Sequence, residues 1–193
     1  RGAGELLQEP LPEPDRQEFT ADILAQTQRL QSLVDRLLEL SKLEQRQELH
    51  QPQSLVLADF LASFMAQALT ERAALAIDLI ASESLEVVRI EPALLSLALA
   101  NLLDNAAAFA PPGGCTTLAA VGRSIVVQDM GPGVPDYALP KLGQKFFSTV
   151  RPDGHTKGSG LGLAIVAQTM ALHGGTLHIE NTHPGLRVTL QFP

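Results

Sequence analysis

Two asparagines within an apolar stretch are the first residues whose types and spacing suggest chemistry. Asn101 and Asn105 lie in the run 94–108, LLSLALANLLDNAAA. Apolar residues recur there at helical spacing and Pro92 suits a first helical position, so the run predicts a largely buried helix. Residues four apart share one helix face, and a buried amide is costly without a partner. Structural hydrogen bonds to a neighbouring strand or a bound ligand would each satisfy the pair.

Two glycine-containing stretches follow further along the chain. Asp129–Gly133 comes directly after an apolar strand-like run, and by itself such a stretch is most often an Asx-turn. Gly158–Leu163 leads into a predicted helix, whose free N–H groups attract anions. It has neither the P-loop nor the dinucleotide-binding spacing, and a merely flexible loop is the alternative.

The segment between these stretches is basic, although the chain has a formal net charge of −7. Between residues 141 and 157, Asp153 is the only acid. The basic residues there are Lys141, Lys145, Arg151 and Lys157. An ordinary solvated loop would carry such charges, but the position of this long irregular segment favours a lid over phosphates.

Length and composition limit the class of protein. The chain has 193 residues, and 45% of them are apolar, which suffices for one domain core plus a smaller piece. The acidic balance argues against nucleic acid as a partner. Cys115 is the only cysteine, so an internal disulfide is excluded. No run of eighteen apolar residues occurs, so we expect a soluble chain without membrane contact.

The first fifty residues predict a partial helical hairpin. Residues 1–8 resemble the end of a helix, and Pro10, Pro12 and Pro14 predict a stiff connector. Residues 18–50 predict one long helix. Its heptad-spaced apolar residues are Ile23, Leu30, Leu33, Leu37 and Leu40. We expect such a stripe to pack against another copy of the chain.

After a linker at 50–54, the pattern changes to alternating helices and short strands. We expect helices at 58–72, 94–108 and 161–173, and a short one at 138–145. The expected strands are 75–81, 85–90, 116–120, 124–128, 176–181 and 186–192. This order predicts the α+β class, as a two-layer α/β sandwich with helices on one face of a mixed, mostly antiparallel sheet. Residues 1–50 and 51–193 are the expected domains.

The order of the stretches resembles a known family. N-x-x-x-N, D-x-G-x-G, Phe146-Phe147 and G-x-G-L-G-L occur in the order found in bacterial sensor histidine kinases of the GHKL (Bergerat) ATP-binding fold. There they are the N box, first glycine box, F box and second glycine box. Residues 1–50 resemble the dimerisation and phosphotransfer hairpin. The runs EPALLSLALANLLDNA and GPGVPDYAL are most similar to the CreC-type sensor kinases.

This resemblance implies that ATP and Mg²⁺ are the cofactors. Asp129 would accept a hydrogen bond from the adenine amino group, and Asn105 would be the metal ligand. Lys145 and Arg151 would meet the γ-phosphate, and Asn101 would complete the catalytic set. The other nucleotide-binding residues implied are Gly131, Gly133, Phe146, Gly158, Gly160, Leu161, Gly162 and Leu163.

Asn101 separates two activities within the fold. The related ATPases have a glutamate at this position to activate water, whereas an amide cannot act as a general base. Asn101 therefore favours a kinase over a GHKL ATPase. A non-catalytic, nucleotide-binding dimeric scaffold is a further alternative. Ala108 departs from the family, because many members have a basic phosphate-binding residue there.

The resemblance also implies a relay. The complete protein would phosphorylate a histidine for transfer to a response-regulator aspartate, dimerise through the hairpin, and be an inner-membrane protein with this region in the cytoplasm. The acceptor motif H-E-x-R/K-T-P is absent from all five histidines, so we expect the chain to bind nucleotide without autophosphorylating. Its acceptor would lie shortly before Arg1. His173 is interpreted as a partner of a helix C-terminal dipole.

Overall fold

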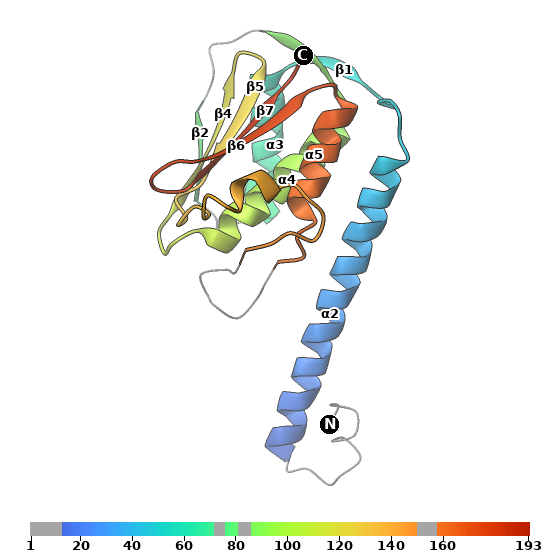
Figure 1. The fold of residues 1–193 in the computed structure, drawn as a ribbon, viewed down its shortest axis with the longest axis vertical. Coiled ribbons are helices and arrows are strands. Elements are labelled where there is room, and N and C mark those ends of the chain that lie inside the picture. Colours follow the sequence, from blue (N-terminus) through green and yellow to red (C-terminus); the bar gives the residue numbers. More distant parts are fainter. Residues whose placement is uncertain (1–12, 72–75, 81–85, 150–157) are drawn as a thin grey trace. The chain divides into compact units, whose positions relative to one another are not determined.

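The computed structural model describes residues 13–71, 76–80, 86–149 and 158–193 (Figure 1). The chain divides into two compact units, Arg1–Glu39 and Leu40–Pro193. Each unit is described by itself. The helix expected at 1–8 and the predicted site residue Arg151 lie outside the described residues.

Helix α2, Glu13–Glu44, is the long helix predicted from the heptad spacing. It begins earlier than expected and contains Pro14, because proline is tolerated in a first helical turn. The connector predicted at Pro14 is therefore wrong. Within the N-terminal unit its large apolar side chains are mostly solvent-exposed. The exposed ones are Leu24, Leu30, Val34, Leu37 and Leu38.

The C-terminal unit is built on a five-stranded sheet of order β2-β4-β5-β7-β6. The strands are β2 (Ala76–Ile80), β4 (Cys115–Val121), β5 (Ser124–Gln128), β6 (Thr176–Asn181) and β7 (Leu186–Gln191). β2 pairs in parallel with β4, and the other neighbours are antiparallel. The predicted mixed, mostly antiparallel sheet is confirmed.

Two further strands form a separate antiparallel ribbon. β3 (Val87–Ile90) was expected, whereas β1 (Gln53–Val56) lies where the sequence suggested a linker. In the register, Gln53 opposes Ile90. The unexpected strand forms because these residues can pair with a neighbour that the local sequence does not reveal.

Three helices cover one face of the sheet (Figure 1): α3 (Leu57–Glu71), α4 (Pro92–Phe109) and α5 (Gly162–Leu172). Alternate strand residues meet them in one aliphatic core, as period-two patterning requires. Buried examples are Leu118, Ile125, Val127, Val188 and Leu190. The helix expected at 138–145 is only a 3₁₀ turn, η1 (Leu139–Lys141), because Leu142 is already extended and Gly143 has a positive φ.

Helix α4 is the apolar centre of this layer. Among the described residues it alone is long and apolar enough to cross a membrane, with a mean hydropathy of 1.3. Eight of its residues are buried within the protein, including Leu95, Leu99 and Leu103. The core therefore accounts for its composition.

The last residues of α2 belong to the C-terminal unit. Leu40 and Leu43 are buried in a second apolar cluster with Leu94, Leu161 and Ile165. This cluster ties the end of α2 to the start of both α4 and α5. The helix stops at Glu44, six residues before the predicted end.

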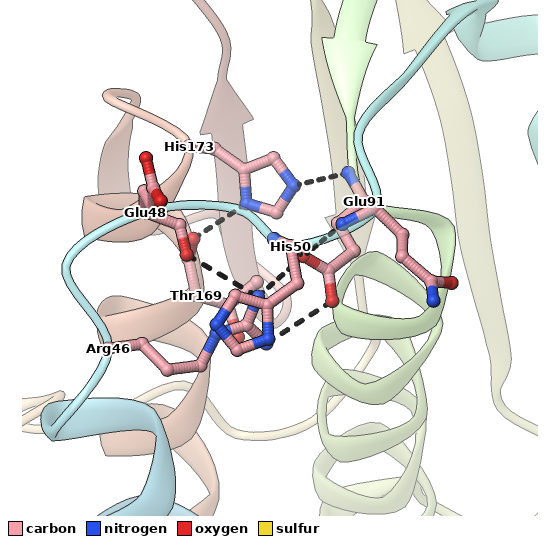
Figure 2. Close-up of polar contacts among 7 residues, drawn as sticks. Arg46, Glu48, His50, Glu91, Thr169 and His173 are labelled. Carbon is pink, nitrogen blue, oxygen red and sulfur yellow. Dashed lines mark hydrogen bonds and ion pairs between the residues drawn. The ribbon is translucent and has the colours of Figure 1, made fainter.

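A largely buried ion pair follows directly after α2 (Figure 2). The Arg46 guanidinium donates to both oxygens of the Glu91 carboxylate, at 3.2 and 2.6 Å. The backbone N–H of His50 donates to Glu91 Oε2 at 2.8 Å. The Arg46 hydrogen bond holds the pKa of Glu91 below its usual value, although burial opposes it. Glu91 thus joins the segment after α2 to the N-terminus of α4.

His173, at the C-terminus of α5, extends this cluster (Figure 2). Its Nε2 accepts the backbone N–H of Glu91 at 3.0 Å, so its Nδ1 carries the proton donated to the Thr169 carbonyl at 2.7 Å. Burial lowers the pKa of His173. The ring therefore contacts the helix end as a neutral donor, and not as the charged dipole partner implied by the sequence.

We expect His173 to make stability depend on pH. As the pH falls below its ordinary pKa of 6.5, the unfolded chain takes up the proton before the folded protein does, so the free energy of unfolding decreases. Urea unfolding of the His173→Gln variant should show a flatter pH dependence between about pH 7 and 5 than the unaltered chain.

The matched control is His178→Gln, because the side chain of His178 is 70% exposed. This variant should keep the pH dependence of the unaltered chain. Equal flattening by both substitutions would show that burial of His173 is not the cause.

Candidate functional site

Asp129 directly follows β5, and its carboxylate is held by backbone hydrogen bonds. One carboxylate oxygen, Oδ1, accepts the backbone N–H groups of Gly131 at 2.8 Å and of Leu186 at 3.1 Å. The Asp129 N–H donates to the Leu186 carbonyl at 3.1 Å. Burial raises the pKa of Asp129, and the two N–H groups oppose that rise. The second oxygen, Oδ2, accepts no hydrogen bond from the described residues and is available to a ligand.

The glycines of this loop are required by close neighbours. A Cβ on Gly131 would lie 2.9 Å from the Phe109 carbonyl oxygen, and one on Gly133 would lie 2.7 Å from Asn181 Oδ1. Gly133 also has φ +72°, which side chains disfavour. The loop therefore fits against the end of α4 on one side and β6 on the other.

The two asparagines of α4 face the start of α5. A Cβ on Gly162 would lie 3.1 Å from Asn101 Oδ1 and 3.7 Å from the Asn105 amide atoms. Asn101 is buried, and its Nδ2 donates to the Leu97 carbonyl at 2.9 Å. Asn105 is half-buried. The predicted N box and second glycine box are thus neighbours.

Helix α4 connects this contact to the Asp129 loop. Phe109, which touches Gly131, lies four residues after Asn105, or about 6 Å along a helix. Amide oxygens suitable for a hard cation and the free N-terminus of α5 therefore lie one helical turn from the carboxylate loop. This donor set fits a nucleotide with a divalent metal ion.

The F box lies against the second glycine box. The Phe146 N–H donates to the Gly160 carbonyl at 3.0 Å, and Phe146 has φ +63° with an exposed ring. A Cβ on Gly160 would lie 2.7 Å from the Phe147 N. Only glycine fits at this crossing. Leu161 is fully buried, whereas Gly158 and Leu163 are half-buried.

Lys145 is paired within the protein. Its ammonium lies 2.7 Å from the carboxylate of Glu44 at the end of α2. The two side chains are 48% and 38% exposed. An exposed pair contributes only about 0–1 kcal/mol to stability, so Lys145 can separate from Glu44 at little cost.

Four contacts of the site were missed by the sequence analysis. Asn181, Gly185 and Leu186 support the Asp129 loop, and Glu44 pairs with Lys145. The Pro-Gly pair at 184–185 signals a tight turn, but the sequence does not indicate what that turn touches.

Comparisons with known proteins show the family of this chain. Residues 90–193 match the family described as histidine kinase-, DNA gyrase B-, and HSP90-like ATPases. Residues 1–46 match the His Kinase A (phospho-acceptor) domain. The first match covers more than half of the chain, so the protein belongs to this ATPase family.

Its relatives are sensor kinases. The chain is 41% identical over 192 residues to the sensor protein CreC of Escherichia coli K12, covering 96% of this chain and 40% of CreC. It is 34% identical over 184 residues to the histidine-protein kinase/phosphatase MprB of Mycobacterium tuberculosis, covering 91% and 35%. The predicted likeness to CreC-type sensor kinases is confirmed. The chain spans 40% of the length of CreC and 35% of the length of MprB.

Solved structures agree on the fold. Full-length ShkA in complex with AMPPNP has a TM-score of 0.73 at 25% identity, covering 99% of this chain and 41% of ShkA. The mycobacterial sensor histidine kinase MprB has a TM-score of 0.59 at 26% identity, covering 75% and 97%. The chain therefore has the fold of the kinase region of these sensor histidine kinases.

One expectation needs correction. We expected a truncated hairpin whose phosphoacceptor would lie before Arg1, but residues 1–46 match the phospho-acceptor domain. These matched residues contain no histidine, and His50 is the first in the sequence.

Proposed function

We propose that this chain binds Mg-ATP and supplies the catalytic domain of a sensor histidine kinase. The observation that carries the proposal is the position of α4, whose Phe109 touches the Asp129 loop and whose asparagines meet Gly162. Asp129 Oδ2 accepts a hydrogen bond from the adenine amino group. Gly133 has no side chain, so the base can lie close to the backbone of the loop. AMPPNP in the ShkA structure supports an adenine nucleotide.

The phosphates lie at the N-terminus of α5 in this proposal. Backbone N–H groups of Gly160–Leu163 bind them, because a helix N-terminus favours anions. Asn105 holds Mg²⁺ through its amide oxygen, and the metal neutralises phosphate charge. Lys145 leaves Glu44 to reach the γ-phosphate, and Arg151 is the second cation proposed there.

Asn101 favours phosphoryl transfer to protein over hydrolysis. Its amide cannot remove a proton from water, and its Nδ2 is already committed to the Leu97 carbonyl. We therefore place this chain among the kinases and not the hydrolysing ATPases of the fold. A non-catalytic scaffold is the alternative from another class, and retention of the complete Asp129 loop argues against it.

The complete protein is proposed to pass phosphate to a response-regulator aspartate. The apolar side chains exposed on α2 support dimerisation, with residues 1–50 as the dimerisation domain and 51–193 as the catalytic domain. Likeness to sensor kinases supports a cytoplasmic place in an inner-membrane protein.

Asp129→Asn tests the adenine contact without removing the loop support. Asparagine keeps Oδ1 for Gly131 and Leu186 but replaces Oδ2 with an NH₂ donor, which cannot accept the adenine amino group. We expect ADP affinity, measured by calorimetry, to fall about ten- to a hundredfold because a hydrogen bond to a charged group is lost.

Two comparisons separate binding from folding in this test. Urea unfolding should find Asp129→Asn close to the unaltered chain and Asp129→Ala less stable, because alanine leaves two N–H groups without their acceptor. Inosine diphosphate carries a carbonyl where ADP has the amino group, so the preference for ADP should narrow in Asp129→Asn. Unchanged ADP affinity in this variant would refute the assignment.

Asn105→Ala tests the metal ligand. We expect the gain in ADP affinity on adding Mg²⁺ to disappear, because the amide oxygen is lost. Asn105→Asp is the control, since its carboxylate keeps an oxygen ligand and should retain the Mg²⁺ effect. If titrations of Asn105→Ala with Mg²⁺ and with chelator still differ as before, the metal has another ligand.

We also infer that the 193-residue chain does not phosphorylate itself. The residues matched to the phospho-acceptor domain hold no histidine, and both ring nitrogens of the buried His173 are occupied. Incubation with γ-labelled ATP should leave the nucleotide-binding chain unlabelled. Acid-labile label that disappears when one of the five histidines becomes glutamine would disprove this.

A further inference from the structure

The side chain of Asn181, the last residue of β6, is hydrogen-bonded to the backbone of the loop after Asp129. Its Oδ1 accepts the Val134 N–H at 2.9 Å, and its Nδ2 donates to the Val134 carbonyl at 2.7 Å. One side chain thus satisfies both backbone groups of one loop residue, as a neighbouring strand would.

The loop offers few other places for backbone attachment. Pro132 and Pro135 flank Gly133 and Val134 and have no N–H to donate. The Gly131 N–H already serves Asp129. Val134 therefore provides the anchoring point beyond Gly133, and Asn181 is its partner.

The turn that follows Asn181 holds the other end of the loop. The Thr182 N–H donates to the Gly185 carbonyl at 2.8 Å, which closes the turn. Gly185 has φ +97°, and a Cβ there would overlap the Asp129 carbonyl. The Leu186 N–H reaches Asp129 Oδ1. Residues 181–186 thus hydrogen-bond to the loop at two places, Asp129 and Val134.

We propose that Asn181 is a positioning residue for recognition of the adenine base, an inference that rests on the proposed function. Asn181 acts through Val134 and does not itself contact the base. By fixing the loop beyond Gly133, it sets the distance between the base and Asp129 Oδ2. Base selectivity, and not phosphate binding, is the property that depends on it.

The test measures ADP and inosine diphosphate binding to the Asn181→Ala variant of the full chain by calorimetry. Loss of two hydrogen bonds should weaken ADP binding roughly tenfold and narrow the ratio of ADP to inosine diphosphate affinity. Glu180→Gln is the matched control: it alters the adjacent residue of β6, whose 3.3 Å pair with Arg187 is exposed, and should leave both affinities unchanged.

A variant combining Asn181→Ala with Asp129→Asn distinguishes positioning from general loosening. If Asn181 acts through the carboxylate, its removal should not change the selectivity ratio further once Asp129 is asparagine. A second, additive fall in the ratio would overturn the proposal. So would unchanged ADP affinity and selectivity in a folded Asn181→Ala protein.

Other outcomes are also decisive. If Asn181→Ala does not fold by urea titration, Asn181→Asp takes its place, since it keeps the acceptor for the Val134 N–H but loses the donor. Unaltered selectivity in Asn181→Asp would overturn the proposal. If the unaltered chain binds no ADP, or Asp129→Asn binds it equally well, the proposed function fails together with this inference. If ADP affinity falls in Asp129→Asn but not in the Asn181 variant, the proposed function stands and only the role of Asn181 is refuted.

Discussion

The loop after β5 depends on one carboxylate oxygen that accepts two backbone N–H groups. Asp129 Oδ1 holds Gly131 from the loop itself and Leu186 from β7, 57 residues away. Each unsatisfied buried N–H would cost about 1–3 kcal/mol, so this oxygen fixes the loop conformation. The requirement for glycine at 131 and 185 follows, because both backbones approach this residue too closely for a side chain.

The packing of helix α4 determines the positions of the other residues of the candidate site. Its apolar residues fill the core, so its axis and rotation are fixed by packing. Asn101 and Asn105 must consequently point at Gly162, and Phe109 must meet Gly131. The helix places polar groups for two loops that are far apart in sequence. Packing of the apolar face of α4 in the core therefore also sets the geometry of the site.

The sequence predicted what local pattern determines. Period and glycine spacing predicted the sheet and core helices, and the order of the boxes predicted the family, which the matches over residues 1–46 and 90–193 confirm. It missed contacts between distant residues, such as Asn181 with Val134 and Arg46 with Glu91, because an asparagine or arginine in a loop carries no mark of its partner. The site roles of Asn105, Asp129 and Lys145 stay predictions.

Two ion pairs close to the end of α2 differ in the free energy that breaking them would cost. Arg46 and Glu91 are only 15% and 9% exposed and share several hydrogen bonds, so removing either partner would leave a buried charge at a cost of several kcal/mol. Glu44 and Lys145 are exposed and weakly coupled. Lys145 can therefore separate from Glu44 at little cost while the attachment at Arg46 stays intact. Breaking the Lys145–Glu44 pair thus does not require α2 to detach from α4.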